Sequence, residues 1–404
     1  METQAPSATV PPDLAGVTIC QVIPALNAGG AERTTLEVAR GVVRAGGRSL
    51  VVSSGGGMVA QLEDEGSTHV ALNAGAKNPV SMTRTRGRLG ALIKEKGVSL
   101  LHARSRAPAW PAYAAARGAG IPFVTTYHGA YSARTKAKQL YNSVMVRGDA
   151  AIANSQFTAD TVRRTYEGWS FFDPAKLVTI PRGADLSRFA PDAVTPDRLA
   201  AMDERLGGRD ALRVLLPGRL TEWKGQAVLI EAARRLQTQD GLPALSVALV
   251  GDAQGREAYE EGLRRMIEEA DLTRVVRLAG PVDDMPAAYA WSDIVVSASV
   301  RPEAFGRVAV EAMAMARPVV ATAHGGSLET VANGETGTLV PPGDADALAE
   351  AIGALANDPD ARAAMGQRGR RRAATRYSTD AMVDATLRVY ATLTAPGGGG
   401  ARQR

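Results

Sequence analysis

Cysteine and aromatic residues are scarce in this chain. Its 404 residues include one cysteine, Cys20, and 5% aromatic residues. A single cysteine rules out a disulfide framework and favours a reducing compartment. Because aromatic and basic side chains are not interleaved, and no helix-turn-helix or zinc-finger spacing occurs, nucleic acid is not an expected partner.

Long hydrophobic runs are also lacking. No apolar run approaches the roughly 20 residues of a membrane-spanning helix. The opening stretch METQAPSATVPPDL is polar and Pro-rich, without the basic start and apolar segment of a secretory signal. We therefore expect a cytoplasmic protein. Peripheral attachment to the inner face of the cytoplasmic membrane is a further expectation, treated below.

Motifs of several catalytic classes are missing as well. The chain has no HExxH, no DxD between strands and no pair of cysteines, so neither a metal nor a cofactor is expected. It also lacks a GxSxG elbow and a P-loop, which argues against a serine hydrolase or a nucleoside triphosphatase. The formal net charge of +5 and the pI near 9.4 instead suit anionic ligands or anionic lipid surfaces.

Strand-like apolar runs alternate with helical patterns through most of the chain, which predicts an α/β fold with parallel sheets. Since 404 residues exceed one ordinary core, we expect two doubly wound domains. Strands are expected at 17–23, 48–53, 98–102, 123–126, 150–153 and 177–180, and then at 213–216, 246–250, 275–278, 294–297, 319–322 and 337–340. The expected divisions are a flexible N-terminus (1–15), a first domain (16–190), a linker (191–210), a second domain (211–375), a final helix (376–395) and a disordered tail (396–404).

The segment RPEAFGRVAVEAMAMARPVVATAHGG is the most informative part of the sequence. Two carboxylates, Glu303 and Glu311, lie eight positions apart around a Phe305-Gly306 turn, after which helical spacing begins. Glu311 falls within an apolar run, where a charge is costly unless something pairs with it. A helix opening at Gly306 would direct free backbone N–H groups toward an anion. Together these features would suit a phosphorylated sugar.

Two cations follow the first expected strand of the second domain, in the stretch LLPGRLTEWKG. Arg219 comes directly after Gly218, and Lys224 follows in the same loop, before the next expected helix. The Arg fork and the Lys point charge together suit a diphosphate. A solvated basic loop is the alternative, and the position at a strand end favours a ligand.

Glycine and histidine mark two strand ends in the first domain. Gly29-Gly30 lies between a strand and a helix, where doubly wound domains bind ligands, although a tight turn would explain the pair as well. His128, one of four histidines, follows the strand FVTTY, and a purely structural histidine is the alternative.

Basic residues occupy other strand ends. Arg104 and Arg106 follow the strand expected at 98–102, and Arg182 follows the strand expected at 177–180. Each is a candidate for contact with an anionic acceptor. Two longer basic stretches, 131–147 and 368–376, could lie on an anionic membrane surface, and solvated helix faces explain both without a membrane.

Taken together, these segments resemble the retaining glycosyltransferases of family 4, which have the GT-B fold. The resemblance runs from Val17 to about Val389 and rests on GGAE, TYHG, ANS, IPRGAD, GRLTEWKG, VGD and PEAFGRVAVEAMAMARPVVAT, the last being the family's paired-glutamate signature. It implies two Rossmann-like domains facing a central cleft. The first would hold the acceptor and the second a nucleotide-sugar donor, and the final helix would cross back to the first domain.

The resemblance also implies roles for single residues. Glu303 would bond hydroxyls of the donor sugar, Glu311 would bond the nucleotide ribose, and His128 would lie beside the reacting sugar. The implied donor-binding set is Gly30, Gly218, Arg219, Lys224, Glu303, Phe305, Gly306 and Glu311, and the catalytic set is His128, Arg219, Lys224 and Glu303. The acceptor candidates, chosen from their positions at strand ends, are Gly29, Arg104, Arg106 and Arg182. The chain departs from the family at Arg182-Gly183, where relatives often have Asn-Gly.

The expected activity is transfer of a hexosyl-type sugar from a nucleoside diphosphate to a hydroxyl of a glycan or lipid-linked glycan, with retention and without a metal. Arg219, Lys224 and the helix start would stabilise the leaving diphosphate. The basic first domain suggests an envelope glycan such as a lipopolysaccharide core. A nucleotide-sugar epimerase of the same fold and a non-catalytic glycan- or nucleotide-binding relative are the alternatives.

Overall fold

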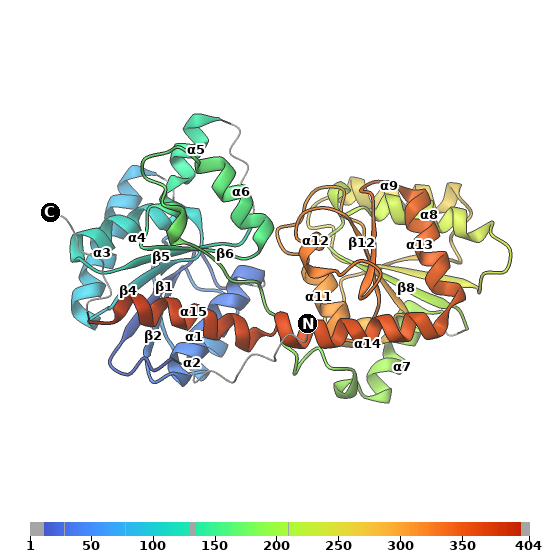
Figure 1. Ribbon diagram of the computed structural model, residues 1–404, viewed down its shortest axis with the longest axis horizontal. Helices are drawn as coiled ribbons and strands as arrows, with labels where there is room; N and C mark the ends of the chain where they lie inside the picture. Colours follow the sequence, from blue (N-terminus) through green and yellow to red (C-terminus); the bar gives the residue numbers. More distant parts are fainter. Residues whose placement is uncertain (1–11, 28, 77, 130–134, 209, 397–404) are drawn as a thin grey trace, which may run out of the picture. The chain divides into compact units, whose positions relative to one another are not determined.

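The computed structural model describes residues 12–27, 29–76, 78–129, 135–208 and 210–396. The flexible N-terminus and the disordered tail that the sequence predicts fall largely outside these residues, as does the start of the basic stretch 131–147. The chain forms two units, one made of Met1–Pro181 with Thr379–Arg404 and the other of Arg182–Ser378 (Figure 1). We call them unit 1 and unit 2.

Unit 1 is built on a parallel sheet, which has seven strands in the described part of the chain, in the order β3-β2-β1-β4-β5-β6-β7. Its strands are β1 (Thr18–Val22), β2 (Arg48–Ser53), β3 (Thr68–Ala71), β4 (Leu100–Ala103), β5 (Phe123–Tyr127), β6 (Ala150–Ala153) and β7 (Leu177–Thr179). Most are buried on both faces, as their continuous apolar runs predict.

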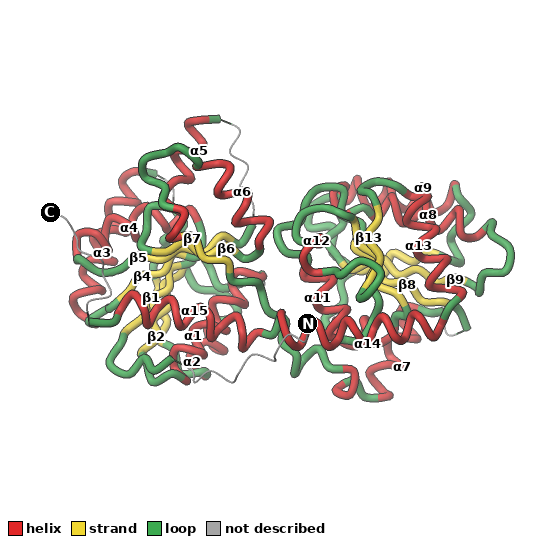
Figure 2. Tube along the Cα trace, in the orientation of Figure 1, coloured by secondary structure: helices red, strands yellow, loops and turns green. Residues whose placement is uncertain are grey.

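Helices cover both faces of this sheet (Figure 2). They are α1 (Gly30–Arg44), α2 (Val59–Asp64), α3 (Pro79–Lys96), α4 (Arg106–Ala119), α5 (Lys136–Asn142), α6 (Gln156–Tyr166) and α15 (Thr379–Thr394). Neighbouring residues of β1 point to opposite faces, so Cys20 packs with α3 and α4 while Ile19 packs with α1 and α15. The C-terminal helix thus supplies part of the core of unit 1.

Unit 2 repeats this plan with a parallel sheet in the order β10-β9-β8-β11-β12-β13. Its strands are β8 (Leu212–Pro217), β9 (Leu245–Val250), β10 (Val276–Gly280), β11 (Ile294–Ser297), β12 (Val319–Thr322) and β13 (Gly337–Val340), and its helices are α7 (Pro196–Leu206), α8 (Gln226–Gln237), α9 (Glu257–Glu269), α10 (Met285–Trp291), α11 (Arg307–Ala314), α12 (Ser327–Thr330), α13 (Ala345–Asn357) and α14 (Pro359–Arg376). Apolar residues of α8, α9 and α13 cover one face, and those of α7, α10, α11 and α14 cover the other.

The division between the units differs from the one that the sequence suggested. The chain passes from unit 1 to unit 2 between Pro181 and Arg182, before the expected linker 191–210. That segment is largely helix α7, whose Met202 and Leu206 are buried in the core of unit 2. Its proline and turn formers cap and start the helix, with Thr195 as N-cap and Pro196 in the first turn, so they do not mark a loose connection.

None of the helices in the described ranges combines the length and the apolar character that a membrane crossing would require.

Candidate functional site

The candidate site of unit 2 lies where the strand order of its sheet reverses. β8 lies between β9 and β11, so the chain leaves β8 toward one side of the sheet and leaves β11 toward the other. Parallel α/β sheets bind ligands at the carboxyl ends of such neighbouring strands. Gly218, Arg219 and Lys224 follow β8, and Glu303 follows β11.

An ion pair joins the two strand ends. Lys224 Nζ lies 2.7 Å from Glu303 Oε1, and both side chains are largely buried, at 13% and 12% exposure. The ammonium also lies 4.5 Å from the centre of the Trp223 ring, within the range of a cation–π interaction. The Ser299 hydroxyl donates to the same Glu303 oxygen. One acidic and one basic group are therefore held together at the carboxyl ends of β8 and β11.

Backbone contacts fix the Lys224 loop against β11. The N–H of Val300 donates to the carbonyl of Trp223 at 2.8 Å. Gly225 adopts a φ of +77°, and a Cβ at this position would lie only 1.9 Å from the Ala298 carbonyl oxygen. Only glycine allows this close approach, which explains the Lys-Gly pair in the sequence.

The Glu303 loop leads directly into the start of α11. Gly326 donates its N–H to the Glu303 carbonyl at 2.8 Å, and Phe305 is buried. Gly306 has a φ of +83° and forms the N-cap of α11 without a side-chain cap. The loop therefore presents a carboxylate, a neighbouring ammonium and the start of a helix, a set that can bind hydroxyl groups and an anion.

Glu311 is held from two directions inside α11. The carboxylate is 8% exposed, accepts a 2.9 Å hydrogen bond from the Tyr289 hydroxyl and pairs with Arg307 one turn earlier, at 2.5 Å. Burial, with the nearby Glu311 charge, raises the pKa of Tyr289 well above its usual range, so this phenol stays a donor. Because both partners bond the carboxylate, the apolar helix can hold it in a buried position.

Sequence reasoning missed three of these contacts. The spacing of Arg307 and Glu311 is the i,i+4 spacing of helical ion pairs and could have revealed that contact. Ser299 lies four residues before Glu303 in the loop after β11, outside any helix, and Tyr289 reaches Glu311 from α10, so helical spacing predicts neither contact. Arg219, in contrast, is exposed, and its carbonyl accepts a 2.9 Å bond from the Gln226 amide.

In unit 1 the predicted residues gather at the carboxyl ends of β1, β4 and β5. Gly29 is the extended N-cap of α1, and Gly30 is the first residue of that helix. Arg106 opens α4 and donates to the Asn142 side chain at 3.0 Å. His128 follows β5 and is partly buried. The strand order of this sheet reverses between the neighbours β1 and β4, so the carboxyl ends of these strands are a second candidate binding region.

Arg104 has a structural position. It is 1% exposed, and its guanidinium donates to the Gln21 side-chain oxygen at 2.7 Å. Burial lowers the pKa of Arg104. Because its donors face the interior, Arg104 does not present them to an acceptor. Arg182 lies in unit 2, two residues before the bridge between Ala184 and Ser378.

His102 is also buried and ties α15 to the sheet. Its Nδ1 lies 2.5 Å from the Tyr390 hydroxyl, and its Nε2 lies 2.8 Å from the Thr126 hydroxyl. Burial, and to a lesser extent the Arg104 charge, lowers the pKa of His102 well below its usual value. This neutral histidine has a structural role, because it joins α15 to β5 in the interior of unit 1.

The sequence matches two described families. Residues 28–188 match "Glycosyltransferase Family 4", and residues 204–372 match "Glycosyl transferases group 1". Among curated proteins, a relative from Mycolicibacterium smegmatis, the GDP-mannose-dependent alpha-(1-6)-phosphatidylinositol monomannoside mannosyltransferase, is 40% identical over 50% of this chain and 53% of its own length. A D-inositol 3-phosphate glycosyltransferase from Kineococcus radiotolerans is 37% identical over 61% of this chain and 58% of its own. The chain thus spans little more than half the length of these relatives.

Solved structures match over nearly the whole chain. A glycosyltransferase from Rickettsia africae is 33% identical, with a TM-score of 0.86 over 94% of this chain and 99% of its own. Anabaena HepE, solved with UDP and glucose, is 25% identical, with a TM-score of 0.78 over 93% of this chain and 99% of its own. With both sheets parallel and each half matched by a glycosyltransferase family, the chain belongs to the glycosyltransferases of the GT-B fold.

Proposed function

We propose that the protein transfers a hexosyl-type sugar from a nucleoside diphosphate sugar to a hydroxyl of a glycan acceptor, with retention of anomeric configuration. The ion pair of Lys224 and Glu303 beside the start of α11 carries this proposal. It places a cation for a diphosphate next to a carboxylate for sugar hydroxyls, at the strand ends where parallel sheets bind nucleotides.

Stabilisation of the negative charge that develops on the diphosphate would lower the barrier to the reaction. Breaking the glycosidic bond leaves negative charge on the diphosphate, and Lys224, Arg219 and the N–H groups at the start of α11 would hold that charge without a metal. Glu303 would orient the sugar and Glu311 the ribose. The acceptor oxygen would bond the anomeric carbon on the face from which the diphosphate leaves, so the configuration is retained, and the departing phosphate would take up the proton of the acceptor hydroxyl. His128, directly after β5, is proposed as a further catalytic residue.

The acceptor is proposed from the relatives' names. The mycobacterial relative acts on a phosphatidylinositol mannoside, and the Kineococcus relative acts on D-inositol 3-phosphate. Both acceptors carry an inositol and a phosphate. We therefore favour an acceptor of this class, lipid-linked or free, over a lipopolysaccharide core. Arg106 and Gly29, at the carboxyl ends of β4 and β1, are its proposed contacts, and Arg182 of unit 2 is proposed separately as a contact for an anion.

A membrane-bound acceptor would also fit helix α5. Lys136 and Lys138 begin this helix, and Leu140 and Tyr141 near its end are 50% and 42% exposed. Cations beside exposed apolar side chains are typical of segments that lie on anionic membranes. Flotation with vesicles of anionic lipid tests the proposal, and equal flotation with neutral vesicles would contradict it.

The test of the activity has two steps. A thermal-shift panel of nucleotide sugars identifies the donor, because a ligand that binds only the folded protein raises its melting temperature. The stabilising donor is then incubated with inositol phosphate, a phosphatidylinositol mannoside or a lipopolysaccharide core, and NMR of the product reports the anomeric configuration. An inverted product, or no product with any acceptor, contradicts the proposal.

An epimerase is the second candidate, because it would bind the same donor on the same fold. Incubation with donor alone separates the two, since an epimerase converts the sugar nucleotide without any acceptor. A non-catalytic binding protein would show the thermal shift and neither reaction.

A further inference from the structure

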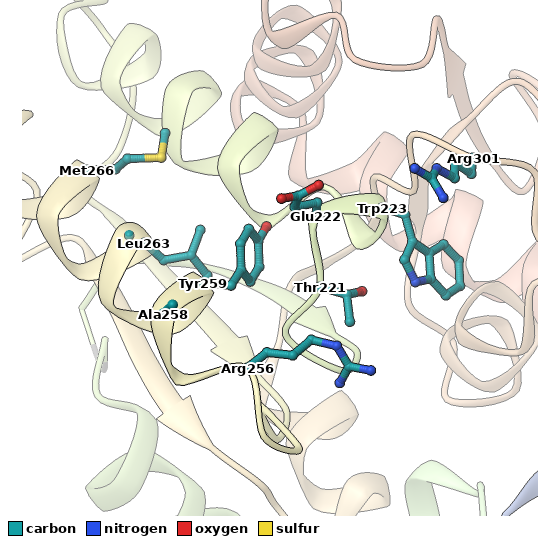
Figure 3. Close-up of a pocket in the computed structure, with 10 residues that line it drawn as sticks. Thr221, Glu222, Trp223, Arg256, Ala258, Tyr259, Leu263, Met266 and Arg301 are labelled. Atoms are coloured by element: carbon teal, nitrogen blue, oxygen red, sulfur yellow. The ribbon is translucent and has the colours of Figure 1, made fainter.

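Unit 2 contains a cavity that the proposed donor site does not use. It has a volume of about 760 Å³, within the usual range for small-molecule sites, and lies between the loop after β8 and helix α9 (Figure 3). Neither Lys224 nor Glu303 is among the residues that line it. The cavity therefore has its own set of lining groups.

Two cationic side chains line the cavity. They are Arg256, the N-cap residue of α9, and Arg301, from the loop after β11, and both are exposed. Figure 3 shows Thr221 and Trp223 between the two arginines, and Thr221 is only 6% exposed. Its hydroxyl has no hydrogen-bond partner among the described residues. A buried hydroxyl without a partner is unfavourable, so a ligand that reaches and bonds it would gain affinity there.

One side of the cavity is apolar. Tyr259, Leu263 and Met266 follow one another at helical spacing along α9 and face the cavity. Figure 3 shows Leu263 and Met266 on the side away from Arg301, with Tyr259 between them and Thr221. Glu222 lies near the Tyr259 ring in this view, so the cavity's one lining carboxylate stands apart from Arg256.

The cavity wall continues into the proposed donor site. Thr221, Glu222 and Trp223 line the cavity, and the next residue is Lys224, which bonds Glu303. The Trp223 ring lies both in the cavity wall and under the Lys224 ammonium. A ligand that moves Trp223 would therefore change the position of Lys224.

We infer that this cavity is a second binding site, for a phosphate monoester that carries an apolar group. The two guanidinium groups are charge-assisted donors for phosphate oxygens, the Thr221 hydroxyl is a further donor, and the face formed by Tyr259, Leu263 and Met266 takes the apolar group. The site goes beyond the proposed function, because its ligand is neither the donor nor the acceptor. Two sources share this chemistry, a phospholipid and a soluble aromatic phosphate.

Calorimetry with phenyl phosphate tests the site on the full chain without any turnover. Phenyl phosphate should bind at least about 10-fold more tightly than inorganic phosphate, which lacks the apolar group. Arg256→Gln and Arg301→Gln should each weaken it about 10-fold or more, since each removes a charge-assisted bond. Arg234→Gln, at an exposed ion pair on α8, is the matched control and should bind normally.

Further arms separate the site from the donor site and identify the source. The fluorescence of the wild type should change on binding, and this change should be lost in Trp223→Phe. Tighter binding of monomeric dihexanoyl phosphatidate than of phenyl phosphate indicates a lipid ligand, and the reverse order indicates a soluble one. Melting temperatures of the variants show that they are folded.

Three results would overturn the inference. They are equal affinity for phenyl phosphate and inorganic phosphate, unchanged affinity in both arginine variants, and displacement of phenyl phosphate by excess UDP together with loss of its binding in Lys224→Ala. The last result would assign the ligand to the donor site. If UDP fails to bind while phenyl phosphate binds as described, the proposed function fails and this site stands.

Discussion

Lys224 and Glu303 form a 2.7 Å ion pair across 79 residues of sequence, because β8 and β11 are neighbours in the sheet of unit 2. The pair is largely shielded from water, so its two charges interact more strongly than a surface pair would. The proposed donor chemistry rests on this contact, and the first prediction concerns it.

Lys224→Ala should lower turnover by roughly 10²–10³-fold, the scale for one lost donor that stabilises developing charge. Steady-state transfer with the donor found by thermal shift is the measurement. Lys176→Ala, at an exposed lysine of unit 1, is the matched control and should transfer at the wild-type rate. Transfer by Lys224→Ala within about twofold of wild type would remove the proposed role.

Glu311→Gln should weaken nucleotide binding about 10-fold, because a neutral amide is a poorer acceptor for ribose hydroxyls than a carboxylate. Tyr289 and Arg307 remain to hold the side chain, so the fold should persist. Titration calorimetry with the free nucleotide measures the effect, and circular dichroism checks the fold. Unchanged affinity would leave Glu311 with a structural role alone.

Chelation should leave transfer unchanged. Lys224 and Arg219, with the start of α11, are proposed to supply the positive charge that the leaving diphosphate needs. We therefore expect equal rates in EDTA and in magnesium with the wild-type protein. A loss of more than about tenfold in EDTA, restored by a divalent cation, would show that the charge comes from a metal.

Stability should depend on pH through His102. Its pKa is lowered well below the usual 6.5 in the folded state, so below about pH 6.5 the unfolded chain takes up a proton that the folded chain does not. The contribution is complete above that pH and is lost as the pH falls, by about 1.4 kcal/mol per pH unit. Urea denaturation at pH 7.5 and 5.5 measures it.

The control variants isolate this histidine from other titrating groups. His102→Gln should reduce the difference between the two pH values, whereas His69→Gln, on the edge strand β3, should keep it. Equal pH dependence in the wild type and His102→Gln would show that His102 is protonated in the folded state.

Gly225→Ala should destabilise the protein by about 1–3 kcal/mol or more, since it combines a positive φ with a clash against the Ala298 carbonyl. Gly90→Ala is the matched control. Gly90 lies within α3 with open space around its Cβ position, so alanine there should stabilise by about 0.5–1 kcal/mol. Thermal melting distinguishes the two, and similar melting temperatures would contradict the close packing of the Lys224 loop.

The sequence predicted most strands of the two sheets, because buried parallel strands are continuous apolar runs. It missed β3, where Thr68 and Ala71 are exposed and no apolar run exists. β3 is an edge strand that is held by its pairing with β2. Because this pairing depends on β2, the residues of β3 alone do not reveal it. The boundary at 181/182 was missed for a similar reason, since only packing shows that α7 belongs to unit 2.

At the candidate site, the strand-end residues could be chosen from the sequence, but their contacts could not. The sequence placed Lys224 and Glu303 after different strands, and the strand order brings them together. Arg104 shows the limit of the same reasoning. It also follows a strand, yet its side chain turns inward to Gln21. The direction of a side chain depends on packing, which the position of the residue in the sequence does not reveal.

The position of α15 has a consequence for dissecting this protein. Since residues 379–404 complete the unit that begins at the N-terminus, residues 182–378 are topologically an insertion into the other unit. A fragment that stops at Pro181 would leave Ile19, Val124 and Ile152 uncovered and should aggregate. The inserted segment is continuous and can be excised as one gene fragment, whereas its host needs its two pieces rejoined by a short tether.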